Sequence, residues 1–234
     1  MQLTVNYLRE KSVEYILLLL LMGISLPLNA KEEVIIETPP PASLFTFPAV
    51  YDPFELLCVK VMLYKGEKLL WAKPDSARLW LHKAIEKSRR IGYPDGIARA
   101  HISLGLTEVG IGQFHRAFTC YQAAYPYVLQ SQQREFLLCS LYLNIGATYF
   151  YQADYEQVLH YYYLVLQHTL KYGTHNFNIV MAYNNLGDVL LKMEQYDQAA
   201  YYIRKGEELQ VDEADRIHLR TFLTANKAGV AIGK

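Results

Sequence analysis

The chain has 234 residues with 23 basic and 23 acidic side chains, so its formal net charge at pH 7 is zero. Hydrophobic residues make up 52% of the chain and charged residues 20%, which is typical of a folded protein and argues against wholesale disorder. Because phosphate binding requires a concentrated positive field, the neutral balance and the lack of a Lys/Arg run argue against nucleic acid as a main partner.

Residues 1–30 have the pattern of an export signal. Arg9 and Lys11 precede an apolar run at 16–26, and Ala30 offers a cleavage point. The run is shorter than the roughly 20 residues that a membrane-spanning helix needs, and it fits the core of a secretory signal. We therefore expect an exported protein, periplasmic or secreted. An uncleaved membrane anchor and a buried helix are the alternatives.

Residues 31–51 contain Pro39-Pro40-Pro41 and Pro48 and show little helical periodicity. Proline runs favour an extended, semi-rigid chain. This segment is therefore predicted to be a linker between the export signal and a folded domain.

A helical repeat domain is predicted over residues 52–234. The first helix pair is expected at about 53–92, because Asp52 can cap its first helix and Gly92 can end its second. Pro126 lies inside a later helix and should kink or shorten it. The remaining pairs are expected at about 95–130, 132–173 and 177–210, followed by a last helix at about 213–232.

One tripeptide position recurs at a constant interval along the chain. It reads Ser103-Leu104-Gly105, Asn144-Ile145-Gly146, Asn185-Leu186-Gly187 and Asn226-Lys227-Ala228. A fixed period of about 41 residues is typical of helical repeat arrays. A glycine inside a helix costs roughly 1 kcal/mol relative to alanine. Its recurrence in register therefore indicates that the helices approach each other closely at this position.

The large and small residues of these repeats resemble the tetratricopeptide repeat. One repeat supplies Ile145, Gly146, Tyr149, Tyr155, Val158, Tyr162 and Val165, and the next supplies Leu186, Gly187, Leu190, Tyr196, Ala199, Ile203 and Gly206. The resemblance covers about 53–234, although the first pair aligns only through Ala77, Leu81 and Ala84. The period exceeds the usual length of about 34 residues. In this it is similar to the longer-helix variants found in bacterial sensory and regulatory proteins and in some cargo adaptors.

This resemblance implies an all-α fold, a right-handed superhelical solenoid of antiparallel helix pairs. About four pairs plus a C-terminal helix are expected. Each pair cannot bury its apolar face alone, so stability comes from stacking. The first helix of each pair is expected to line the concave wall.

The resemblance also implies a peptide-binding surface on that wall. In relatives that bind extended peptides, the residue before the large-small pair faces the peptide, and in the long-repeat variants an asparagine there often bonds the peptide backbone. The alternative is that these asparagines cap or bridge adjacent helices. The matching positions and their helical neighbours give the candidate peptide-binding residues: Arg99, Ser103, Asn144, Ala147, Tyr151, Asn184, Asn185, Asp188, Lys192 and Asn226. The family members that clamp a C-terminal carboxylate are disfavoured, because Met181 and Asn184 stand where basic residues are needed.

No catalytic pattern is present in the sequence. The seven histidines form no HExxH and no Cys/His zinc spacing, and GxSxG, P-loop and GxGxxG motifs are absent. We therefore expect no enzyme activity, no cofactor and no metal. The odd number of cysteines (Cys58, Cys120 and Cys139) argues against a disulfide framework, although a Cys120–Cys139 bridge stays open.

Together these patterns predict an exported, non-enzymatic module that binds a protein or an extended peptide. It is similar to the N-terminal sensory region of bacterial membrane-bound regulators, in which it would be tethered to the membrane within a longer parent chain. The alternative is a structural assembly protein that self-associates through its unpaired C-terminal helix. Residues Ala225, Ala228, Val230, Ala231 and Ile232 give that helix apolar surface.

Overall fold

The computed structural model describes residues 51–172 and 176–209, and this part of the chain is entirely α-helical. The predicted export signal at 1–30, the linker at 31–51 apart from Tyr51, and the last helix at 213–232 lie outside the described residues, as does Asn226. Among the helices that are described, none combines the length and the apolar character that crossing a membrane requires.

Within residues 51–172 and 176–209, eight helices form four consecutive pairs, as the sequence predicts. Their bounds lie close to the predicted ones: α2 (Pro53–Leu69) and α3 (Pro74–Ile91), α4 (Pro94–Gly110) and α5 (Phe114–Gln130), α6 (Arg134–Tyr151) and α7 (Tyr155–Tyr172), and α8 (Asn176–Lys192) and α9 (Tyr196–Glu208). The second helices of the last three pairs therefore begin at a constant interval, at positions 114, 155 and 196.

The ends of the first pair follow the sequence. The Asp52 side chain accepts a hydrogen bond from the backbone N–H of Glu55 at 2.9 Å, as an N-cap residue does. The Glu55 carboxylate pairs with Lys87 of α3. Gly92 ends α3 with φ of 65°, a left-handed conformation that favours glycine.

Pro126 does not shorten its helix, so one of the two effects expected from the sequence is absent. Helix α5 continues through Pro126 to Gln130. The neighbouring Tyr121, Ala124 and Val128 are completely buried. A proline inside a helix costs about 3 kcal/mol, and the burial of these side chains offsets that cost, so the helix stays continuous.

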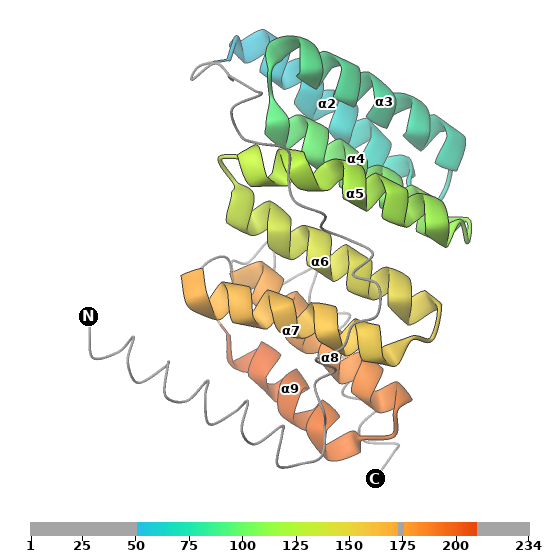
Figure 1. The fold of residues 1–234 in the computed structure, drawn as a ribbon, viewed down its shortest axis with the longest axis vertical. Helices are drawn as coiled ribbons and strands as arrows, with labels where there is room; N and C mark the ends of the chain where they lie inside the picture. Colours follow the sequence, from blue (N-terminus) through green and yellow to red (C-terminus); the bar gives the residue numbers. More distant parts are fainter. Residues whose placement is uncertain (1–50, 173–175, 210–234) are drawn as a thin grey trace, which may run out of the picture. The chain divides into compact units, whose positions relative to one another are not determined.

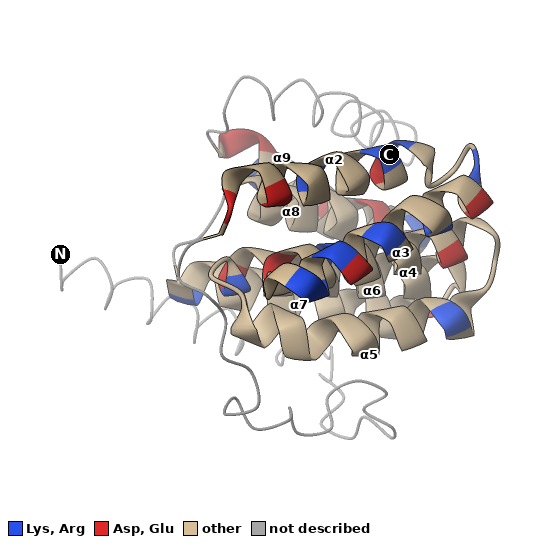
Figure 2. Ribbon diagram, turned by 90° about the horizontal axis from the view of Figure 1, so that it is seen from above, with Lys and Arg blue, Asp and Glu red and all other residues tan. Residues whose placement is uncertain are grey.

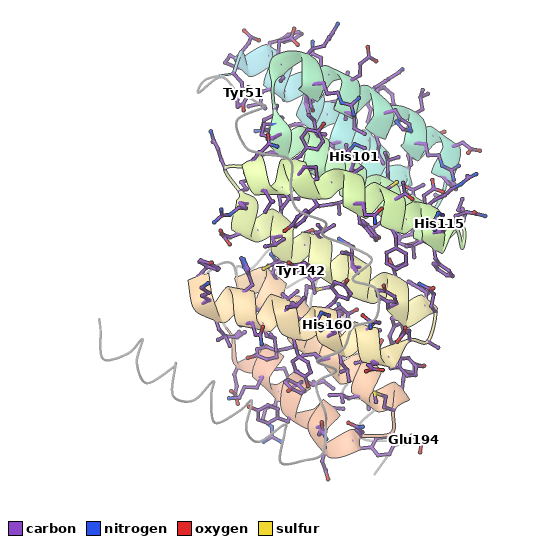
Figure 3. The ribbon with its side chains drawn as sticks, viewed as in Figure 1. Tyr51, His101, His115, Tyr142, His160 and Glu194 are labelled. Atoms are coloured by element: carbon purple, nitrogen blue, oxygen red, sulfur yellow. The ribbon has the colours of Figure 1, made fainter. Side chains whose placement is uncertain are left out.

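The turns inside the last three pairs repeat with the same period. Gly112, Ala153 and Glu194 occupy equivalent positions in successive repeats, and all three have positive φ, at 75°, 59° and 60°. Glu194 lies in the turn that follows α8 (Figure 3). A left-handed conformation costs roughly 1–2 kcal/mol for a residue other than glycine. The backbone thus keeps the same turn even where the sequence does not supply glycine.

The pairs stack one after another from α2/α3 to α8/α9 (Figure 1). Each second helix packs on the first helix of the next pair, and the first helices α2, α4, α6 and α8 contact one another in sequence. The fold is therefore a helical solenoid in which the first helices share one layer and the second helices the other.

A glycine in every first helix admits a large side chain from its partner helix. A methyl group at Gly146 would lie 2.5 Å from Cε1 of Tyr162, and one at Gly187 would lie 2.5 Å from Cγ1 of Ile203. Gly105 meets Tyr121 in the same way, and Gly66 meets Leu81. The sequence comparison missed Gly66, which stands slightly less than one period before Gly105 and extends the pattern into the first pair.

Candidate functional site

The predicted binding residues on α6 and α8, apart from Asn184, follow one side of each helix. On α6, the positions at 140, 144, 147 and 151 are spaced by four, three and four residues, which places them on one face. On α8 the equivalent positions are Met181, Asn185, Asp188 and Lys192, and all eight are partly or fully exposed. We call these two rows the α6 stripe and the α8 stripe.

The hydroxyl group of Tyr162 brings part of the α8 stripe together. Tyr162 rises from α7 under Gly146, and its hydroxyl forms a hydrogen bond with the side chain of Asn185. Burial raises the pKa of Tyr162, and the nearby charge of Asp188 raises it further. Burial also raises the pKa of the Asp188 carboxyl, which the charge of Lys192 lowers in part. Asn185 and Asp188 therefore lie close together around one buried phenol.

Asn144 and Asn185 occupy equivalent positions but form different hydrogen bonds. The Asn144 amide donates to the backbone carbonyl of Ser140 in its own helix, at 2.7 Å. The difference follows from the residue one turn further along each helix, which is Thr148 in α6 and Val189 in α8. In the preceding junction the Tyr121 hydroxyl bonds to Thr148 at 3.2 Å, so it does not need Asn144.

In the next junction, Val189 replaces the equivalent of Thr148 and offers no hydroxyl. The buried phenol of Tyr162 must then bond to Asn185, because an unpaired buried hydroxyl costs about 1–3 kcal/mol. Asn185 thus bridges two helices, while Asn144 is held only by its own backbone.

Arg99 and Ser103 are engaged with a residue that the sequence did not single out. Arg99 donates to both carboxylate oxygens of Glu67 at 3.0 and 3.3 Å, and the Ser103 hydroxyl lies 3.4 Å from the same carboxylate. Glu67 belongs to α2, in the pair whose repeat pattern is weakest. These contacts tie α2 to α4 and neutralise the positive charge of Arg99.

The remaining candidates divide between the surface and the core. Ala147 is partly exposed on the α6 stripe, and Tyr151 at its end is 62% exposed. Asn184 is buried. Asn178, which was not predicted, is also buried and donates to the carbonyl of Phe136, so it joins α8 to α6.

An exposed tryptophan adds a second aromatic residue to this side of the molecule. Trp71 follows α2, and its ring covers Gly110, where a methyl group would lie 2.7 Å from Trp71 Cε3. Trp71 follows Gly66 at the same offset as Tyr151 follows Gly146, so the two aromatic residues are equivalent in the repeat register. Sequence reasoning missed Trp71 because the first pair is degenerate.

One cluster has the order of groups found in cysteine nucleophile sites. Cys139 Sγ lies 3.6 Å from His168 Nδ1, and His168 Nε2 lies 2.8 Å from the Glu135 carboxylate. A nucleophilic cysteine must be accessible and deprotonated. Cys139 is buried, and burial raises the pKa of its thiol, so the cluster is a packing arrangement. Cys58, Cys120 and Cys139 are free thiols, so the Cys120–Cys139 bridge is not formed. Over residues 51–172 and 176–209, no group of three or more His, Cys, Asp or Glu side chains could hold a metal ion.

The repeat geometry agrees with a comparison to protein families. Residues 137–210 match the model of the tetratricopeptide repeat. This part of the chain consists of tetratricopeptide repeats. The match covers α6 to α9, and α2 to α5 continue the same pairing, with a glycine contact in each pair. No curated protein and no solved structure matches the chain.

The resemblance seen in the sequence is therefore confirmed, together with the all-α solenoid of helix pairs. Tetratricopeptide repeat arrays are protein–protein interaction modules, and this is the class of function that the family gives. The grouping with the long-period sensory variants stays a prediction.

Proposed function

We propose that this tetratricopeptide repeat protein binds an extended peptide or protein segment along the α6 and α8 stripes, and that it acts without catalysis. The observation that supports this most directly is the α6 stripe. It lies in the layer of first helices, between α4 and α8, and presents Asn144, Ala147 and Tyr151 in one row.

The chemistry of this row suits a peptide backbone. The Asn144 amide uses one N–H on its own helix, which leaves a second N–H and the carbonyl oxygen for a ligand. An extended strand offers a C=O and an N–H at matching spacing. The small side chain of Ala147 leaves space for a ligand at the centre of the row. The exposed ring of Tyr151 supplies apolar area with a hydroxyl at its edge.

The charged groups of the site favour a ligand that carries a hydrogen-bond donor or a positive charge. Arg99 is neutralised by Glu67, so it offers little to an anionic peptide. Asp188 and Lys192 stand one turn apart on the α8 stripe. The half-buried Asp188 carboxylate favours a donor such as a lysine or an N–H group on the ligand.

The test uses peptides selected from a random display library against the full chain, measured by fluorescence anisotropy. Asn144→Ala and Tyr151→Ala should each weaken binding by about tenfold or more, because each removes a contact at the centre of the surface. Arg116→Ala on the exposed surface of α5 is the control and should change nothing.

The bonding difference between the two asparagines sharpens this test. Asn144→Ala should leave the melting temperature nearly unchanged, whereas Asn185→Ala should lower stability by about 1 kcal/mol or more because it leaves the Tyr162 hydroxyl unpaired. If Asn144→Ala unfolds the protein, or if selected peptides bind the Asn144→Ala and Tyr151→Ala variants normally, the proposal is wrong.

We further propose that the protein is exported and forms the sensory part of a larger bacterial regulator. The support is the pattern of residues 1–30 together with the long repeat period. Mass spectrometry of the secreted and periplasmic fractions should find a chain that begins at Lys31. Recovery of the chain in the cytoplasm, starting at Met1, would contradict export.

A further inference from the structure

Helix α2 has an apolar row on the side that faces away from the stack. Phe54, Leu57, Val61 and Tyr64 are spaced by three, four and three residues and are between 42% and 70% exposed. The opposite side of the helix is buried through Val59, Leu63 and Gly66. An amphipathic helix normally exposes polar residues, so this row requires an explanation.

The burial of the equivalent residues in the later repeats indicates the structural role of the row. With the glycines aligned, Val61 is equivalent to Ala100, Leu141 and Ala182, and each of these is completely buried. Leu57 is equivalent to Gly96, Leu137 and Asn178, which are also buried. Leu57 and Val61 therefore lie on the face through which a first helix packs on the pair before it, and Tyr64, which is equivalent to Asn144 and Asn185, lies at the edge of that face.

In those repeats the face is covered by a helix. Helix α3 packs on α4, α5 on α6, and α7 on α8. No element of the described residues packs on α2 in this way, and a terminal repeat is expected to have a polar outer side. The shape of the face thus suits a helix in the place of the second helix of a preceding pair.

The charge around the row is strongly positive. Residues 53–91 contain nine basic and four acidic side chains, an excess of five, in a chain whose total charge is zero. The basic positions are prominent along α3 in Figure 2. Both acidic residues of α2 are engaged, Glu55 with Lys87 and Glu67 with Arg99.

Two lysines border the row and are held by aromatic rings. Lys68 continues the row one turn after Tyr64, with its ammonium 4.8 Å from the centre of the Tyr64 ring. Lys65 lies beside the row, 4.3 Å from the centre of the Trp80 ring. We call Phe54, Leu57, Val61, Tyr64, Lys65 and Lys68 the end face.

We propose that the end face docks an amphipathic helix of another protein, one that has an apolar stripe and acidic flanks. The apolar stripe takes the place that a preceding second helix has in the later repeats, and the acidic flanks pair with Lys65 and Lys68. This interaction goes beyond the peptide binding proposed above, because it uses a different surface and a helical ligand.

Charge distinguishes this partner from two others. In an antiparallel pair with a second copy of α2, Lys68 would face Leu57 of the other copy, and the two Lys65 side chains would share one side, so like charges would repel. A membrane would have to accommodate the charge of Lys68, which continues the apolar row one turn after Tyr64, and this is costly.

The experiment uses the full chain and two synthetic amphipathic peptides of roughly 20 residues, long enough to be helical. Both have the same leucine stripe, and their flanks are glutamate in one and lysine in the other. By fluorescence anisotropy at about 0.15 M salt, the glutamate peptide should bind and the lysine peptide should not.

Variants of exposed residues test the end face directly. Val61→Asp should weaken binding of the glutamate peptide by about tenfold or more, because it places a charge in the apolar centre of the interface. The control is Leu79→Asp, an exposed leucine on α3 outside the end face, which should have no effect. The double change Lys65→Glu and Lys68→Glu should reverse the preference in favour of the lysine peptide.

Other outcomes overturn the proposal. Equal binding of both peptides would show that charge does not select the partner. Dimerisation that Val61→Asp abolishes would identify a second copy as the occupant, and sedimentation with phosphatidylserine vesicles but no peptide binding would identify a membrane. Peptide binding only after deletion of residues 35–50 would show that the chain covers its own end face. Asn144→Ala should not affect the glutamate peptide, so failure of the peptide-binding proposal above would leave this one intact.

Discussion

The substitution Gly146→Ala tests the close helix contact at the centre of the stack. The added methyl group would lie 2.5 Å from Cε1 and 2.9 Å from Cδ1 of Tyr162, whereas ordinary carbon contacts begin near 3.4 Å. The Tyr162 ring is buried and bonded to Asn185, so it cannot move aside freely.

The expected change in the free energy of unfolding follows from opposing effects. Alanine gains about 1 kcal/mol over glycine in a helix interior. Overpacking a buried site costs typically about 1–3 kcal/mol, and displacing the hydroxyl from Asn185 costs about 1 kcal/mol more. The net loss is about 1–3 kcal/mol, and a domain of this size loses roughly 2–4 °C in melting temperature for each kcal/mol.

Thermal unfolding followed by circular dichroism measures this loss. The double change Gly146→Ala with Tyr162→Leu is the control. Removing the ring should make the added methyl group neutral or favourable, so the coupling between the two sites should exceed about 1 kcal/mol. If Gly146→Ala alone raises the melting temperature, as at an uncrowded helix position, the close contact does not exist.

Three further predictions concern stability. Burial, with the charge of Arg89, lowers the pKa of His101 from 6.5 to about 4. The free energy of unfolding should therefore fall by up to about 3 kcal/mol as the pH drops from 6.5 to 4. Urea unfolding at several pH values measures this loss, and His101→Phe should flatten it. Ala153→Gly should be neutral to stabilising by up to about 1 kcal/mol by calorimetry, because φ is 59° there; a clear loss would contradict the strained turn. Glu108→Ala should lower the free energy of chemical unfolding by about 2–4 kcal/mol, because it leaves Arg78 without its bidentate partner. Asp75→Ala should leave that free energy unchanged, because the Asp75 carboxylate is exposed. Equal losses in the two variants would refute the difference between the buried and the exposed ion pair.

The architecture could be predicted from the sequence because its causes are local and periodic. The recurrence of Gly105, Gly146 and Gly187 at one constant interval marks the close contacts, and residues such as Asp52 and Gly92 mark helix ends. Each helix then has one apolar side that only stacking can bury. The pairs and their bounds follow from these patterns with little freedom left.

The bonding within the candidate site could not be predicted, because it depends on contacts between repeats. Asn144 and Asn185 look identical in the repeat register, and only the replacement of Thr148 by Val189 makes one of them a bridge. The pairing of Arg99 with Glu67 was hidden by the weak pattern of the first pair. The exposed row on α2 became visible only when its burial was compared with that of later repeats.

The side chains that enter the glycine positions also determine the order in which the repeats can stand. Leu81 and Ile203, at the two ends, have no polar atom, whereas Tyr121 and Tyr162 each have a hydroxyl that requires a partner in the following pair. The pair that follows must therefore carry a hydrogen-bonding side chain at one of two positions, that of Thr148 or that of Asn185. Thr107 of the second pair is equivalent to Thr148, so a copy of that pair could follow either tyrosine. The partner of the buried phenol, rather than the length of a repeat, thus limits which pair can follow which.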